Sequence, residues 1–228
     1  MKLYVIAINI MLCLAFNSYS QEQEDSSYDS TAKEVYEFQE KGANSKDIVP
    51  ENWEILSEAI GDLNGDGFDD LAFFSRRSIK SDSENHYTPN PIVFAIYWGK
   101  EGGFTQYKLY EDLVSPEDGP IYYEDLSVNI PVKRVLTINV KVFLGYGSWT
   151  NPNFSVKYRY QNGAFYKIGY VADEFHRATG DAHDVSINYL TGKKRTILYN
   201  VFEDSIPKRT EWETINEPLT ELGSEPIY

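Results

Sequence analysis

Residues 61–74, GDLNGDGFDDLAFF, carry the side chains whose types and spacing are best suited to chemistry. Ca²⁺ binds six to eight oxygens at about 2.3–2.6 Å, and alternate residues of a tightly wound loop can direct their oxygens at one such ion. Side-chain oxygens stand here at the first, third, fifth and ninth positions of a loop, and the seventh position offers a backbone carbonyl. In that order, the candidate calcium ligands are Asp62, Asn64, Asp66 and Asp70, with the carbonyl of Phe68 at the seventh position.

Two glycines, Gly65 and Gly67, allow this loop to adopt backbone conformations that other residues resist. Without a cation, the carboxylates of the loop would repel one another at close range, so the pattern predicts a loop that is better ordered with calcium bound. The alternative is an acidic turn whose Asp and Asn side chains bond only to the backbone. Four spaced ligands around a placed glycine favour the calcium site over that simple turn.

The residues around the loop indicate the kind of structure that holds it. The twelfth position is Phe73, whereas helix–loop–helix calcium sites carry a bidentate glutamate there. The flanking residues 59–60 and 71–74 are apolar and typical of strands. The sequence therefore predicts a calcium loop inside a β-hairpin, with modest affinity for the ion.

The pattern D-x-[DN]-x-D-G-x-x-D at residues 62–70 resembles the calcium loop of FG-GAP and VCBS-type repeats. That resemblance implies a calcium ion bound by the five ligands named above. The single copy and the lack of a Gly-Ala-Pro signature depart from the multi-bladed propellers of that family. Residues 49–73, 157–170 and 186–194 also resemble exported bacterial proteins of unknown function that carry such repeats, which implies one β domain and no particular reaction.

Residues 1–20 are typical of a cleaved secretory signal peptide. Lys2 precedes an apolar run at residues 3–16, which is too short for a comfortable membrane span, and small residues then precede Gln21. The only cysteine, Cys13, lies inside this segment, so the mature chain would have neither disulfides nor a catalytic thiol. We expect a protein of the periplasm or the cell exterior, with no transmembrane segment in its mature form.

The charge of the chain restricts its partners. Its 228 residues include 35 Asp and Glu against 21 Lys and Arg, which gives a formal net charge of -14. This balance argues against nucleic acid as a partner, because the phosphates would be repelled, and against docking on anionic lipid. It suits a cation or a basic partner.

From Val49 onward the hydrophobic pattern is that of β-strands. Residues 136–144 alternate apolar and polar side chains with a period of two, and residues 154–160 do the same, so both predict strands with one buried face. Asn162-Gly163 is typical of a two-residue hairpin turn. Together, such runs predict an antiparallel all-β meander of about nine or ten strands, with one short N-terminal helix at residues 31–41.

Composition divides the chain into four parts. The signal peptide at residues 1–20 is followed by an acidic disordered segment with the short helix at residues 21–45. The β domain then spans residues 46–202 and contains the calcium loop. Residues 203–228 are polar and punctuated by prolines, which predicts a C-terminal tail outside the domain.

Two other stretches hold candidate functional residues. His176, Asp181, His183 and Asp184, within EFHRATGDAHD, could bind a transition metal, but their spacing matches no helical zinc motif and favours a solvated polar loop. Tyr146 and Trp149 stand in the turn GYGSWTNPN. Since a large aromatic side chain on a loop is hard to explain by core packing, we predict a contact surface there.

The sequence contains no nucleophile elbow of the Gly-x-Ser-x-Gly type and no phosphate-binding glycine loop. We therefore expect a non-catalytic binding or interaction module with structural calcium, whose partner is an unknown protein or glycan. The alternative is a hydrolase that acts on glycans or peptides of the cell envelope. Such an enzyme would need two carboxylates at a set separation, which sequence spacing cannot select.

Overall fold

A computed structural model describes residues 37–77, 90–117, 121–145 and 148–228 of the chain. Residues 37–228 group into a single unit. The predicted signal peptide, residues 21–36 of the predicted acidic segment, and Tyr146 lie outside the described residues.

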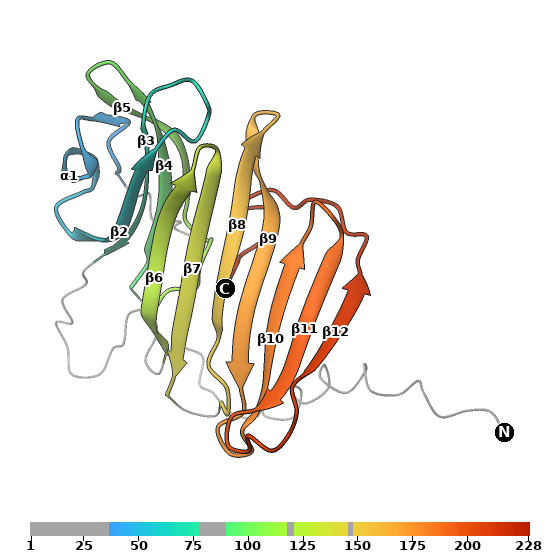
Figure 1. The fold of residues 1–228 in the computed structure, drawn as a ribbon. Coiled ribbons are helices and arrows are strands. Elements are labelled where there is room, and N and C mark those ends of the chain that lie inside the picture. The colour runs from blue at the N-terminus through green and yellow to red at the C-terminus, as the bar shows by residue number, and fades with distance from the viewer. Residues whose placement is uncertain (1–36, 78–89, 118–120, 146–147) are drawn as a thin grey trace, which may run out of the picture. The chain divides into compact units, whose positions relative to one another are not determined.

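The unit contains two antiparallel sheets, drawn in Figure 1 in blue to green and in yellow-green to red. The five-stranded sheet has the order β1-β5-β4-β3-β2, and the seven-stranded sheet has the order β12-β11-β10-β9-β8-β7-β6. The strands of the first sheet are Lys41–Gly42 (β1), Trp53–Gly61 (β2), Asp70–Arg77 (β3), Ile92–Lys100 (β4) and Gly103–Tyr110 (β5). The strands of the second are Ile121–Val132 (β6), Val135–Leu144 (β7), Asn153–Gln161 (β8), Ala164–Phe175 (β9), Asp181–Asn188 (β10), Lys193–Asn200 (β11) and Arg209–Thr214 (β12). The predicted antiparallel all-β fold is confirmed, with twelve strands in the described part of the chain.

The short helix of the domain, α1, spans Ser45–Ile48. Asn44 caps it, because its side-chain oxygen accepts the backbone N–H groups of Lys46 and Asp47. The predicted short N-terminal helix is thus present, but at residues 45–48 and not within 31–41, since the described part of that range, residues 37–41, is not helical. Phe38 instead places its ring edge-on against Trp53, with 5.1 Å between the centroids, and covers the start of β2.

The two most regular strand predictions, β7 and β8, are confirmed. Leu136, Ile138 and Val140 of β7 are buried, and Lys141 on the opposite face is exposed. Asn162 and Gly163 join β8 to β9 with φ angles of 52° and 84°. A tight hairpin turn of this kind needs positive φ at both central residues, which explains why this dipeptide was a reliable signal.

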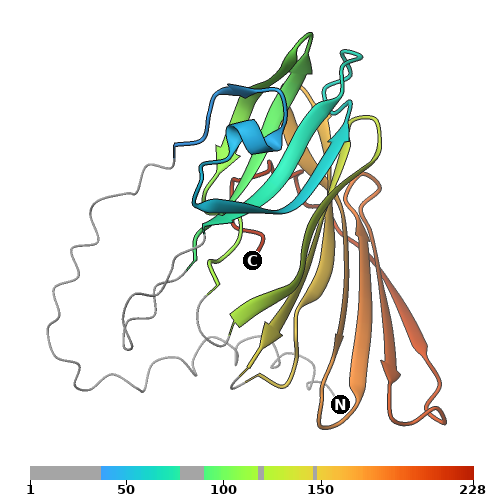
Figure 2. The same ribbon diagram turned by 90° about the vertical axis from the view of Figure 1, so that its left-hand side faces the viewer.

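The two sheets share one hydrophobic core. Phe74 of β3 and Phe94 of β4 have ring centroids 4.6 Å apart and belong to the same buried cluster as the apolar face of β7. Further along, Trp98 of β4 contacts Tyr160 and Phe165 of the second sheet, with centroids 5.2 and 6.1 Å away. In Figure 2 the five-stranded sheet lies against the upper part of the seven-stranded sheet.

The edge strands β2 and β6 hold the two sheets together beside this core. The backbone N–H of Val128 in β6 donates to the hydroxyl of Ser57 in β2 at 3.1 Å. A Cβ atom on Gly61 would lie 2.9 Å from the side chain of Ile130, so glycine is what permits this close approach. The turn between β6 and β7 therefore lies next to the loop between β2 and β3.

The C-terminal segment is part of the domain, so the polar tail predicted at residues 203–228 is wrong. Residues 209–214 form β12 and pair with β11. Leu222 is only 1% exposed, and its N–H donates to the carbonyl of Phe165 at 2.8 Å. The ring of Tyr228 contacts Tyr123, with centroids 6.0 Å apart. The domain therefore spans residues 37–228 and not the predicted 46–202. The C-terminal segment is polar in composition, but a few buried side chains are enough to hold it against the core.

We predict that Leu222→Ala will lower the free energy of unfolding by about 2–5 kcal/mol, because it removes a buried side chain from the shared core. Leu190→Ala makes the same chemical change at a side chain that is 46% exposed, and it should cost no more than about 0.5 kcal/mol. Urea unfolding of both variants measures the difference. Equal, small losses would show that the C-terminal segment is a dispensable tail after all.

Candidate functional site

The acidic loop connects β2 to β3, as the sequence predicted. The two strands pair through Ile60 with Leu71 and Gly61 with Asp70, so residues 62–69 close a β-hairpin. Leu63 is fully buried in the shared core and fixes the start of the loop. Gly65 and Gly67 have φ angles of 90° and 97°, which are the conformations for which glycine is suited.

Three of the predicted ligands hold the loop backbone with their side chains. Asp62 accepts the N–H groups of Gly65 and Gly67, at 2.5 and 3.0 Å, with its two different oxygens. Asn64 accepts the N–H of Asp66 at 2.8 Å. Asp66 in turn accepts the N–H of Phe68 at 2.8 Å. Such bonds from Asp and Asn side chains to nearby backbone N–H groups hold a tight turn in shape.

Asp70, the predicted ligand at the ninth position, is completely buried. One oxygen accepts the N–H groups of Leu63 and Asn64 at 2.7 and 3.2 Å, and the other accepts the N–H of Gly99 in β4 at 2.8 Å. Burial raises the pKa of the Asp70 carboxyl, and these three bonds oppose the rise only in part. Asp70 therefore ties the loop to the middle of the first sheet.

Gly99 makes this buried contact possible. A Cβ atom at this position would lie 1.9 Å from the carbonyl oxygen of Asp69, which no side chain could tolerate. Without a side chain, β4 approaches the end of the loop closely enough for its N–H to reach the Asp70 carboxylate.

Two basic residues in the β6–β7 turn contact the loop, and sequence reasoning missed both. The Lys133 ammonium lies 2.7 Å from Oδ2 of Asp62 and lowers the pKa of that carboxyl. The N–H of Arg134 donates to the Asp62 carbonyl at 2.9 Å, and its guanidinium lies over Gly65, where it would clash with any Cβ. The acidic loop and the β6–β7 turn are far apart in the sequence, and only the packing of the two sheets against each other brings them together.

The donor chemistry of the loop fits a calcium ion. The side chains of Asp62, Asn64 and Asp66 each carry a hard oxygen that can bind calcium, on alternate residues of one tight loop, although the Asn64 amide also donates to Asp66 at 2.9 Å. Asp62 and Asp70 each accept three hydrogen bonds, out of about four lone-pair sites that a carboxylate offers. Within the described residues, no three His, Cys, Asp or Glu side chains gather closely enough to hold a metal ion. Calcium at this loop therefore stays a prediction.

At the other end of the second sheet, the structure joins the two other stretches that the sequence singled out. The loops β7–β8 and β9–β10 lie together at the lower end of the sheet in Figure 1, away from the β6–β7 turn. The N–H of Arg177 donates to the carbonyl of Trp149 at 2.9 Å. The ring of Trp149 stacks on His176, with centroids 5.6 Å apart and planes at 24°, and stays 62% exposed.

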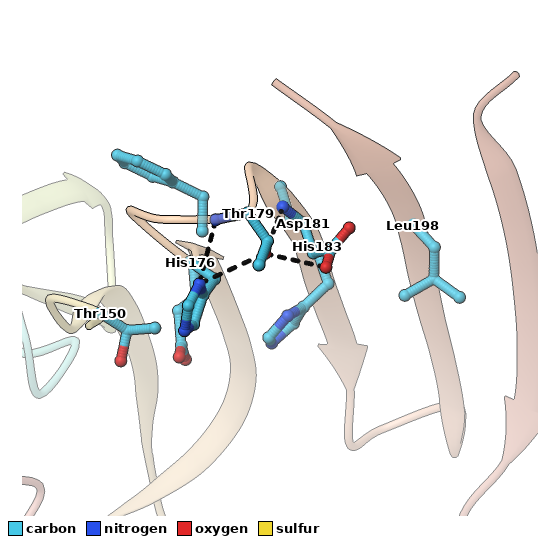
Figure 3. A pocket seen from close by; sticks show the side chains of 9 residues that line it. Thr150, His176, Thr179, Asp181, His183 and Leu198 are labelled. Atoms are coloured by element: carbon cyan, nitrogen blue, oxygen red, sulfur yellow. Dashed lines mark hydrogen bonds between the residues drawn. The ribbon is translucent and has the colours of Figure 1, made fainter. Parts of the chain in front are cut away.

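Beside this stacked pair lies a pocket of about 480 Å³. Figure 3 shows Thr150, His176 and His183 around it, with Leu198 on the neighbouring strand. Glu174 of β9 is paired with His183 of β10, which is paired in turn with Leu198 of β11, so one row of side chains crosses the pocket floor. The remaining lining residues are Phe175, Thr179, Asp181 and Ala182.

Some of the polar side chains that line the pocket are held by hydrogen bonds, and others are not. Nδ1 of His176 accepts the N–H of Thr179 at 3.2 Å. Asp181 accepts the Thr179 hydroxyl at 2.9 Å and the side-chain amide of Asn200 at 3.1 Å. Across the described ranges, the side chains of Glu174 and His183 have no hydrogen-bond or ion-pair partner.

The polar loop predicted for the second histidine is wrong, because residues 181–188 form β10. His183 faces the pocket, whereas Asp184 points to the opposite face of the strand and accepts the Tyr199 hydroxyl at 2.9 Å. The four residues weighed as a transition-metal site are thus divided between two faces of the sheet. Glu174 was missed at the sequence level, since only strand register places it opposite His183.

No family model matches the chain, and neither does any curated protein or solved structure. The interpretation of function therefore rests on the acidic loop at one end of the domain and on the pocket beside Trp149 at the other.

We predict that Asp70→Ala will lower the free energy of unfolding by about 3–5 kcal/mol, measured by urea unfolding in the presence of a chelator. The substitution leaves the buried N–H groups of Leu63 and Gly99 without their acceptor. Asp69→Ala removes the exposed carboxylate next to it and should cost no more than about 0.5 kcal/mol. A loss below about 1 kcal/mol for Asp70→Ala would mean that the loop is not held by this side chain.

Proposed function

We propose that this chain is an exported, non-catalytic binding domain that contacts its ligand at the end of the seven-stranded sheet where Trp149 lies. The observation that carries the proposal is the exposure of Trp149 in a fixed position, stacked on His176 and anchored through Arg177 next to a pocket. Because the Trp149 indole is exposed to solvent, packing in the core does not explain its presence. Loops that are fixed on a rigid sheet are also common sites of binding.

The framework around Trp149 supports a preformed contact surface. The guanidinium of Arg177 donates to the side chain of Asn151 at 2.7 Å and to the carbonyl of Leu144 at 3.3 Å. It also lies over the ring of Phe143, 5.7 Å from the centroid. The two loops are therefore linked to each other and to β7, so that little conformational freedom would be lost when a ligand binds.

In the same proposal, the acidic loop is a structural calcium site that stabilises the β2–β3 hairpin. Asp62, Asn64, Asp66, the Phe68 carbonyl and Asp70 would hold the ion, which would neutralise the charge of the loop. Lys133 already supplies one positive charge at Asp62, so the ion would have to displace it. This competition and the lack of a glutamate at the twelfth position both favour a modest affinity.

The second candidate function is a hydrolase that acts on glycans or peptides of the cell envelope. Glu174 and His183 favour it, because an unpartnered carboxylate beside an unpartnered imidazole in a pocket is the kind of pair that serves in general acid–base catalysis.

The location in the periplasm or outside the cell is also a proposal, resting on residues 1–20. No helix in the described part of the chain is long and apolar enough to cross a membrane.

The binding function is tested by sedimenting residues 21–228 with isolated bacterial envelope fragments. Trp149→Ala should reduce the bound fraction by about tenfold, since exposed aromatic anchors carry much of the energy of an interface. Trp212→Ala removes a tryptophan of β12 that is equally open to solvent, at 65% exposure, and should leave binding unchanged. Binding that both variants retain, or both lose, would contradict the proposed contact surface.

The calcium site is tested by thermal unfolding of residues 21–228 with calcium and with chelator. For a dissociation constant of about 10⁻⁴–10⁻³ M, calcium at about 10 mM should raise the melting temperature by about 3–10 °C. Asp66→Ala should abolish this rise while changing stability little in chelator, because Asp66 is exposed. An unchanged melting temperature in the parent chain would make the loop a polar turn without an ion.

Lys133→Met serves as a second variant in that experiment. It removes the cation that competes at Asp62, so the calcium-dependent rise should be larger than in the parent chain. Lys141→Met removes a lysine of the same sheet that pairs with Glu124 instead, and it should leave the rise unchanged. An equal rise in both lysine variants would show that Lys133 and the ion do not share Asp62.

A further inference from the structure

We propose that the pocket beside Trp149 is a subsite for a neutral sugar unit of an envelope glycan, with Glu174, His176 and His183 as hydrogen-bonding partners and with the exposed face of Trp149 as the stacking surface for a neighbouring unit of the same glycan. This inference rests on the proposed binding function, because it names the ligand class of the same site. The residues of the subsite come from the loops β7–β8 and β9–β10 and from the row of Glu174, His183 and Leu198 that crosses β9, β10 and β11.

The pocket has the size and the mixed lining of a small-ligand site. Its volume of about 480 Å³ falls within the range of about 300–1,000 Å³ that is typical of such pockets. Leu198 contributes apolar surface on the same face of the sheet as Glu174 and His183, which suits the C–H face of a sugar ring. Several polar side chains also line the pocket, and a site that must orient a hydroxyl-rich ligand needs both kinds of surface.

The polar side chains that lack a protein partner offer both donors and acceptors. Glu174 presents a carboxylate that can only accept hydrogen bonds while it is ionised. Because Nδ1 of His176 accepts an N–H, the neutral ring carries its proton on Nε2 and can donate from there. A neutral His183 offers one donor and one acceptor. Hydroxyl groups also donate and accept, so a sugar can satisfy all three side chains.

Trp149 lies outside the pocket lining and adds a surface for the neighbouring sugar ring. One face of the indole stacks on His176, and the high exposure of the side chain leaves the opposite face to solvent. Aromatic rings bind the apolar face of a flat ligand while its polar edge stays hydrogen-bonded. The stack also holds His176 in place, which couples the aromatic surface to one of the hydrogen-bond donors.

The charges around the pocket disfavour an anionic ligand. Glu174 and Asp181 would repel a phosphate or a carboxylate, and the nearby Arg177 guanidinium already bonds to Asn151 and Leu144. A basic peptide would pair with these carboxylates, so the proteinase digestion described below is needed to separate it from a sugar. A neutral, hydroxyl-rich ligand matches the mixture of donors and acceptors in the pocket.

The test is sedimentation of residues 21–228 with envelope fragments in three forms, which are untreated, oxidised with periodate, and digested with proteinase. Periodate cleaves vicinal diols, so it should abolish binding to a sugar unit that has two adjacent free hydroxyls, whereas digestion should leave binding intact. Binding that survives both treatments would contradict a ligand of that kind. Glu174→Ala should lower binding to untreated fragments by about tenfold, because it removes the free acceptor of the pocket. Glu101→Ala, which removes an exposed carboxylate of the β4–β5 turn, should leave binding unchanged.

Each outcome separates this inference from the function on which it rests. Binding that survives periodate but is lost on digestion, and that still depends on Trp149, would keep the binding function and replace the sugar by a peptide. Binding that does not depend on Trp149 would overturn both proposals. Release of new reducing ends from the fragments by the parent chain, but not by Glu174→Ala, would replace the binding domain by the hydrolase.

Discussion

The apolar faces of the two open sheets cover each other, and the rest of the domain is built outward from this contact. Phe94 of the first sheet and Leu136 of the second are both completely buried in the shared cluster. Neither sheet could keep these side chains from water alone, because an antiparallel sheet with one apolar face needs a second layer. The C-terminal segment completes that layer, since Leu222 fills a position in the same core.

Two consequences follow at opposite ends of the seven-stranded sheet. Where the edges of the sheets meet, the acidic loop lies against the β6–β7 turn, and Asp62 gains the ammonium of Lys133. At the other end, the loops β7–β8 and β9–β10 extend away from that contact and place Trp149 against His176. At the end with the acidic loop, the charged groups bond to other groups of the protein. At the end with Trp149, the side chains of Glu174 and His183 have no such partner in the described part of the chain.

The acidic loop illustrates how position decides the behaviour of like side chains. Asp62 and Asp70 belong to one loop, yet their pKa values shift in opposite directions. The bond to Lys133 favours the ionised form of Asp62, whereas burial disfavours the ionised form of Asp70 despite its three backbone donors. The protein itself therefore compensates part of the charge of the loop, and the proposed calcium ion would add stability to a hairpin that is already formed.

The sequence by itself determined the local features of this protein. The alternation in β7 and β8, the turn at Asn162-Gly163 and the hairpin around the acidic loop all depend on neighbours within a few residues. The tertiary structure decided the role of the C-terminal segment, the cation beside Asp62 and the row that joins Glu174 to His183. Those contacts depend on sheet order and strand register, which are set by the burial of whole apolar faces rather than by any short stretch of sequence.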